Sequence, residues 1–183
     1  MLMRNKVIAA IRTKEELIKA SFSDVRIIFD LNPNIMSVEE NLKTAHKEGK
    51  KYFIHIDLAE GIGKDKSGIE YLKKLGIDGV ISTRTSIIRS ARELGVFTVQ
   101  RFFIVDSHSI ETTLEAIKSS KPQMVEIMPG SVVKVISRLK ETLEIPIIAG
   151  GLIETEEEAL EIIRSGASAV STGRTELWKN KEN

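Results

Sequence analysis

LGIDGVISTR, residues 75–84, is the stretch that decides the fold. It ends a charged, amphipathic segment at a glycine and then enters a short β-branched run, which is the order of a helix, a left-handed glycine cap and a strand. SGASAVSTGR, residues 165–174, repeats this order near the other end of the sequence. The two stretches match only after a shift of one residue, so a duplicated half remains a suggestion.

Working outward, the same alternation runs through the whole chain without a linker or a low-complexity segment. Candidate strands lie at residues 7–11, 25–30, 52–57, 79–83, 96–103, 124–128, 146–149 and 168–172. Several are almost uninterrupted Val, Ile and Phe, a pattern typical of parallel strands covered on both faces. Eight βα units in order favour a closed barrel, because an open doubly wound sheet needs fewer strands or a switch point.

We therefore predict an α/β protein, a small single-domain (β/α)₈ barrel of the TIM type over residues 1–183. About 250 residues is usual for this fold. The loops must then be short, and the last helix, around residues 175–179, should be little more than a turn.

The ends of the helices carry their own signals. A Ser or Thr followed three residues later by Glu, the capping-box pattern, occurs at Ser37/Glu40, Ser67/Glu70 and Thr155/Glu158. Glycines suited to a left-handed cap precede strands at Gly49, Gly76, Gly95 and Gly166.

Composition narrows the function. Of the 183 residues 42% are hydrophobic, and no apolar run approaches the roughly 18 residues that a membrane span needs. The sequence has no cysteine, which excludes disulfides and thiolate nucleophiles and fits a cytoplasmic location. A net charge of +1 gives no global electrostatic reason to bind nucleic acid.

In such barrels the functional face is built from the loops that follow the carboxyl ends of the strands. Gly150 and Gly151 follow the seventh candidate strand, and Ser171, Thr172 and Gly173 end the eighth. These are the two places where barrels commonly hold a phosphate on backbone N–H groups, to which a hydroxyl can add a donor. We favour a phosphate site here over a simple tight turn.

Other polar residues at strand ends leave alternatives open. Arg84 and Arg101 could meet an anion or pair with Asp57 and Glu126 in a structural network. Asp57 could bind the hydroxyls of a polyol, act as a base, or cap a loop. His55, alone in an apolar strand, is more typical of a hydrogen-bonded core residue than of a catalyst.

Several enzyme chemistries are disfavoured. No lysine stands at a strand end where an aldolase would form a Schiff base, and no Gly-x-Ser-x-Gly or P-loop pattern occurs. The three histidines share no metal-ligand spacing, so we expect no metal and no cofactor. The basic cluster Lys43, Lys47, Lys50 and Lys51 is a candidate RNA-binding surface, although such a run is usually a solvated face.

The sequence resembles the glycerol 3-phosphate-responsive antiterminator family, regulators of bacterial glycerol-utilisation operons. The matching blocks are FIHIDLAEGIGKDKSGIEYLKKLGIDGVISTR (53–84), VQRFFIVDS (99–107), VEIMPG (125–130), PIIAGGLIETEEEAL (146–160) and AVSTGRTELW (169–178). Single blocks occur in many barrels. HIDLAEG, ISTR and QRFFIVDS together are rather specific.

The resemblance implies a barrel that binds glycerol 3-phosphate and, with it bound, the leader mRNA of a glycerol operon, so that transcription passes a terminator. It implies a ligand site of Asp57, Arg84, Arg101, Glu126, Gly150, Gly151, Ser171 and Thr172. Gly173 departs from the small polar residue that we expect at its position in the family. On this interpretation the protein is not an enzyme. The rivals are a barrel enzyme acting on a small phosphorylated substrate, with Asp57 or Glu126 as base, and a metabolite sensor with a protein partner. The oligomeric state, a homo-oligomer included, stays open.

Overall fold

The computed structural model describes residues 6–179 and shows a closed barrel of eight parallel strands in the order β1 to β8, with β8 pairing back to β1. The strands are β1 Val7–Ile11, β2 Ile27–Asp30, β3 Lys51–His55, β4 Gly79–Ser82, β5 Thr98–Phe103, β6 Met124–Met128, β7 Ile147–Gly150 and β8 Ala169–Thr172. All eight candidate strands are present, with ends that move by one or two residues. The predicted (β/α)₈ fold is confirmed.

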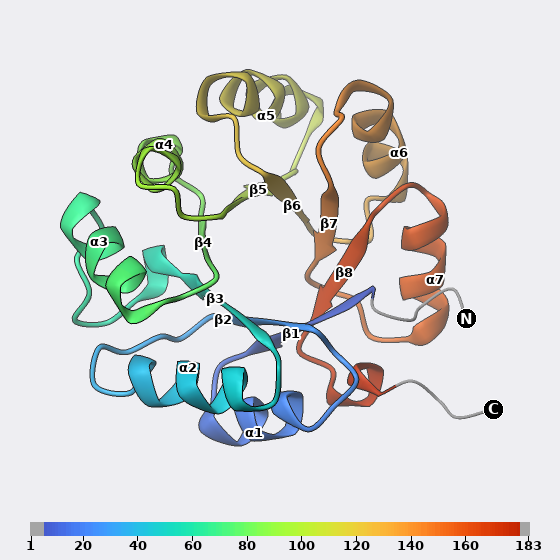
Figure 1. The fold of residues 1–183 in the computed structure, drawn as a ribbon. Helices are drawn as coiled ribbons and strands as arrows, with labels where there is room; N and C mark the ends of the chain where they lie inside the picture. Colours follow the sequence, from blue (N-terminus) through green and yellow to red (C-terminus); the bar gives the residue numbers. More distant parts are fainter. Residues whose placement is uncertain (1–5, 180–183) are drawn as a thin grey trace.

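The helices form a ring around the barrel (Figure 1). They are α1 Lys14–Ser21, α2 Val38–Lys47, α3 Lys66–Leu75, α4 Thr85–Glu93, α5 Ser107–Ser120, α6 Val133–Thr142 and α7 Glu156–Arg164. Two 3₁₀ turns, η1 Ile56–Leu58 and η2 Thr175–Trp178, follow β3 and β8. The short terminal turn is as the sequence predicts. None of the described helices is long and apolar enough to cross a membrane.

The helix starts agree with the sequence only in part. Thr155 and Glu158 form a complete capping box, whereas Ser37 occupies the cap position of α2 without a side-chain hydrogen bond. The expected box at Ser67 is wrong. Asp65 caps α3 instead, by accepting from the N–H of Gly68, because its carboxylate reaches the first turn before Ser67 can.

The glycine caps are confirmed. The four predicted positions all have positive φ, namely Gly49 (68°), Gly76 (89°), Gly95 (72°) and Gly166 (113°). At Gly76 the N–H donates to the last turn of α3 from this left-handed conformation, which a Cβ would strain.

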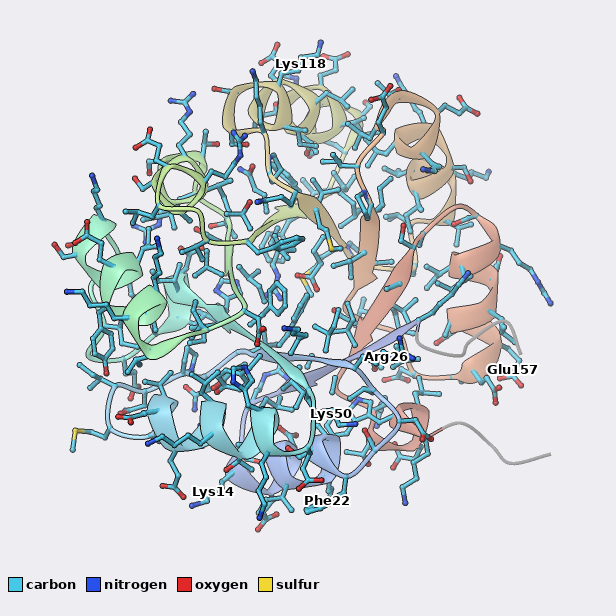
Figure 2. All side chains as sticks on the ribbon, in the orientation of Figure 1. Lys14, Phe22, Arg26, Lys50, Lys118 and Glu157 are labelled. Atoms are coloured by element: carbon cyan, nitrogen blue, oxygen red, sulfur yellow. The ribbon has the colours of Figure 1, made fainter. Side chains whose placement is uncertain are left out.

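The hydrophobic core has an inner and an outer part. Two large clusters join the outward-facing strand residues to the helices. A third cluster contains no helical residue and fills the barrel interior, with Phe29, Phe53, Ile81, Val99 and Ile148 among its members. Charged side chains such as Lys118 and Glu157 lie on the outside of the helical ring (Figure 2). Because successive strand residues alternate between the two sides, the inner cluster also fixes which polar residues face inward.

Candidate functional site at the carboxyl end of the barrel

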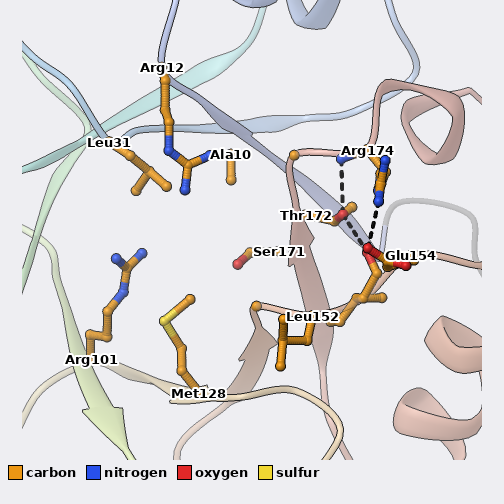
Figure 3. A pocket seen from close by; sticks show the side chains of 13 residues that line it. Ala10, Arg12, Leu31, Arg101, Met128, Leu152, Glu154, Ser171, Thr172 and Arg174 are labelled. Atoms are coloured by element: carbon orange, nitrogen blue, oxygen red, sulfur yellow. Dashed lines mark hydrogen bonds and ion pairs between the residues drawn. The ribbon is translucent and has the colours of Figure 1, made fainter.

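A pocket of about 350 Å³ opens at the carboxyl ends of the strands, beside β1, β7 and β8 (Figure 3). Five of its lining residues are ones that the sequence singled out: Arg101, Gly151, Ser171, Thr172 and Gly173. The segment that follows β7 and the segment that follows β8 thus meet at one cavity, as the phosphate-site prediction requires.

Two arginines that sequence reasoning missed also line the pocket, Arg12 directly after β1 and Arg174 after β8. Each is the first charged residue beyond its strand, and that position was the available signal. Arg174 is turned toward Glu154, to which its Nη2 donates at 2.5 Å, whereas Arg12 and Arg101 point toward one another across the pocket (Figure 3). Within residues 6–179 no carboxylate forms an ion pair with the Arg12 side chain.

The floor of the pocket holds a buried ion pair. Arg101 Nε donates to Glu126 Oε2 at 2.6 Å, and Ser171 Oγ donates to Glu126 Oε1 at 2.5 Å. Glu126 has no exposed surface and Arg101 is 5% exposed. The structural pairing that the sequence left open for Arg101 is therefore present. Arg101 also remains available to the pocket, because its Nη2 is buried without a hydrogen-bond partner.

Gly150 makes room for this floor. A Cβ at position 150 would lie 2.5 Å from Glu126 Oε1 and 2.6 Å from Ser171 Oγ, closer than atoms can approach. Glycine here permits the hydrogen bond between the two side chains.

The rim after β7 has an unusual backbone. Gly151 has φ of 75° and Leu152, an exposed non-glycine residue, has φ of 55°. Backbone N–H groups at Gly151 and Gly173 donate none of the loop hydrogen bonds that the structure shows for residues 6–179. Leu152 lines both the pocket and a second cavity of about 750 Å³ between α6 and α7.

The two hydroxyl groups do not play the part expected of them. Ser171 gives its proton to Glu126, and Thr172 Oγ1 donates to the carbonyl of Ile153 at 2.9 Å. Since a hydroxyl has one proton, neither side chain as placed can donate to a phosphate. The donors left at the pocket are the guanidinium groups and the backbone N–H groups.

Asp57 and Arg84 lie outside the pocket. Asp57 accepts from Ser82 Oγ, the backbone N–H and Oγ1 of Thr83, and Arg84 Nε at 3.1 Å. Burial alone would raise the pKa of Asp57, but these hydrogen bonds outweigh it and hold the pKa below its ordinary value. The pair ties η1 to the start of α4, so the structure does not bring it together with the other predicted ligands.

His55 ends β3 and is 3% exposed. Burial, reinforced by the positive charge of Arg101, lowers its pKa to about 4, so the imidazole is neutral at physiological pH. Its Nδ1 has no hydrogen-bond partner. The side chain is buried as expected, but at this nitrogen it is not hydrogen-bonded.

The lysine cluster lies at the opposite end of the barrel, because the carboxyl end of α2 leads into the amino end of β3. Lys43 pairs with Glu39 and Lys51 with Asp78, and Lys50 Nζ donates to the carbonyl of Ser23. Much of its charge is therefore engaged within the protein.

The fold and site define a class, a small (β/α)₈ barrel with an arginine-lined pocket at the carboxyl ends of its strands. The chain belongs to the glycerol-3-phosphate responsive antiterminator family, which it matches over residues 7–178. It is 38% identical to the Escherichia coli K12 protein YgcP over 179 residues, 97% of this chain and 94% of that protein.

Two solved structures are similar throughout. The glycerol uptake operon antiterminator regulatory protein of Listeria monocytogenes has 32% identity and a TM-score of 0.89, covering 94% of each chain. An antiterminator-related protein of Thermotoga maritima has 33% identity and a TM-score of 0.86, covering 96% of this chain and 99% of that one. An aldolase with 13% identity and a TM-score of 0.77 shares the fold alone.

Proposed function

We propose that this protein binds glycerol 3-phosphate in the arginine-lined pocket and, with the ligand bound, binds the leader mRNA of a glycerol-utilisation operon so that transcription passes a terminator. Membership of the antiterminator family supports the regulatory role. Because both effector and nascent transcript are cytoplasmic, we place the protein there.

The observation that carries the proposal is the pair Arg12 and Arg101. Two guanidinium groups that point toward one another across a small cavity repel unless an anion lies between them. Gly173 adjoins Arg12, since a Cβ there would lie 3.7 Å from Arg12 Nη1. A phosphate between Arg12 and the glycine backbone would thus meet charge-assisted donors. The volume of about 350 Å³ is at the small end of ligand sites, which suits a three-carbon phosphate.

The rival proposal, an enzyme acting on a small phosphorylated substrate, has weaker support. The residues that line the pocket include no lysine, cysteine or histidine. Both oxygens of Glu126 already accept hydrogen bonds, so this carboxylate is poorly placed to take a proton from a substrate. We therefore propose binding without turnover.

The test of ligand binding is thermal unfolding with glycerol 3-phosphate, glycerol and no ligand. Glycerol 3-phosphate at 100 times its dissociation constant should add about 2.7 kcal/mol to the unfolding free energy, and glycerol should add nothing. Equal stabilisation by both compounds would remove the phosphate site. Recovery of the ligand unchanged after long incubation separates binding from turnover, and release of dihydroxyacetone phosphate or inorganic phosphate at enzymatic rates would favour the rival.

The test of the output is a gel-shift titration of leader RNA with and without glycerol 3-phosphate. We expect tighter RNA binding with the ligand present. Absence of RNA binding in both conditions would reject the antiterminator output even if the ligand site stands.

A further inference from the structure

The interior of the barrel is apolar except for its last layer of side chains. Residues two positions beyond members of the inner cluster face the same side, so Arg101, Glu126 and Ser171 project into the barrel at the carboxyl end, as does His55. All four are at most 5% exposed. A buried polar layer costs stability unless its groups are paired.

The hydrogen bonds within this layer leave a definite pattern of unused groups. Glu126 accepts from Arg101 through one oxygen and from Ser171 through the other. Ser171 has spent its only proton, so its Oγ offers the pocket lone pairs and no donor. Arg101 offers the opposite, since its Nη2 is a donor without a partner.

An acceptor and a donor on one floor match a hydroxyl, which both donates and accepts. They do not match a phosphate, whose oxygens only accept. A phosphate oxygen against Ser171 Oγ would bring two sets of lone pairs together. Arg12 with the backbone at Gly173 is the better place for the phosphate, and it lies on the opposite side of the pocket from Arg101.

His55 supplies a second observation. Only three buried side-chain nitrogen or oxygen atoms within residues 6–179 have no hydrogen-bond partner, and His55 Nδ1 and Arg101 Nη2 are two of them. Unpartnered buried polar atoms are few in folded proteins and call for an explanation. Finding two in one layer beneath a pocket points to a polar ligand.

We infer that the layer of Arg101, Glu126, Ser171 and His55 is a hydroxyl-recognising subsite, which makes the pocket selective for a phosphorylated polyol over a plain alkyl phosphate. The inference rests on the proposed function, since it assumes a phosphate held at Arg12. It assigns the two ends of the ligand to separate groups of residues.

The experiment compares two ligands that share a phosphate and three carbons, glycerol 3-phosphate and n-propyl phosphate, which lacks both hydroxyls. Dissociation constants are measured by calorimetry for the wild type, Ser171→Ala and Arg12→Gln. The wild type should bind glycerol 3-phosphate at least about tenfold more tightly, because a site built to hydrogen-bond a hydroxyl rejects the analogue without it. Ser171→Ala should erase this preference and leave n-propyl phosphate binding unchanged. Arg12→Gln should weaken both ligands and keep their ratio.

The failures are distinguishable. Equal affinity of the wild type for the two ligands, or an equal loss of both in Ser171→Ala, overturns the subsite and leaves the phosphate site standing. A wild type that binds neither ligand overturns both proposals. Melting temperatures without ligand show whether each variant folds. If Ser171→Ala does not, Arg101→Lys takes its place, because it keeps the charge and loses Nη2, and an unchanged ratio in that variant contradicts the inference.

Discussion

Arg101 and Glu126 face one another across neighbouring strands β5 and β6, paired in register and joined at 2.6 Å with almost no exposed surface. Removing one member of such a pair leaves the other as an uncompensated buried charge. Glu126→Ala should therefore lower the unfolding free energy by about 3–5 kcal/mol, measured by urea denaturation. The exposed pair Arg174 and Glu154 is the control, and Glu154→Ala should change stability little. Similar losses in the two variants would contradict this account of the floor.

Gly151→Val should abolish the stabilisation by glycerol 3-phosphate. The added Cβ would project from a left-handed residue, 3.2 Å from Met128 Cε, and block the backbone from approaching an anion. Gly95→Val is the matched control, with φ of 72° and open space around its Cβ. Both variants carry similar backbone strain, so thermal unfolding without ligand should show comparable losses. A ligand shift retained in Gly151→Val would exclude this segment from the site.

The stability of the protein should fall as the pH is lowered from about 6.5 to about 4, with a contribution from His55. The pKa of His55 is about 4 in the fold and near 6.5 in the unfolded chain, so in this window the unfolded state binds the proton. The contribution is fully present above pH 6.5 and is lost by up to about 1.4 kcal/mol per pH unit below it.

Denaturation of His55→Phe across the same pH range checks this. The difference between wild type and variant isolates His55 from Asp57, its charged neighbour, and from Asp30, whose pKa burial raises and which titrates with the opposite sign. Parallel stability curves for the two proteins would show that His55 is charged in the fold.

RNA and ligand should bind with reciprocal coupling. If glycerol 3-phosphate tightens leader RNA binding about 5- to 150-fold, saturating RNA must tighten ligand binding by the same factor. Because the net charge is only +1, few phosphate contacts are expected and the salt dependence should be shallow. Recognition would then rest on RNA shape and unpaired bases. Unequal factors from the two titrations would contradict a single coupled equilibrium.

The lysine cluster is tested by replacing Lys43, Lys47, Lys50 and Lys51 with Gln. If this surface binds RNA, gel-shift affinity should fall while the ligand's thermal shift is unchanged. The cluster already pairs in part with Glu39 and Asp78, so unchanged RNA affinity would move the interface elsewhere.

The sequence predicted the barrel well because its evidence is periodic and local. Glycines before strands and uninterrupted apolar runs report backbone conformation and two-sided burial directly, and both survived in the structure. The cap at Asp65 was missed because Ser67 and Glu70 fit a pattern, while the competition between two neighbouring caps depends on geometry.

The site could be predicted only to the level of strand ends. Position along the chain placed Arg101, Glu126, Gly151 and Ser171 at one end of the barrel. It did not show that Glu126 takes the proton of Ser171, or that Asp57 turns toward α4, because those outcomes depend on distances across strands. Arg12 escaped notice because it lies one residue beyond a strand whose loop carried no other signal.

Leu152 gives the pocket a wall that it does not own alone. The same side chain borders the cavity at the strand ends and the larger cavity between α6 and α7, and it sits on a backbone that leucine adopts only at a cost. A partition of this kind cannot shift to suit an occupant on one side without reshaping the room on the other. The size of the outer cavity is therefore a remote gauge of what the inner one contains, legible on the surface of the protein without any contact with the ligand.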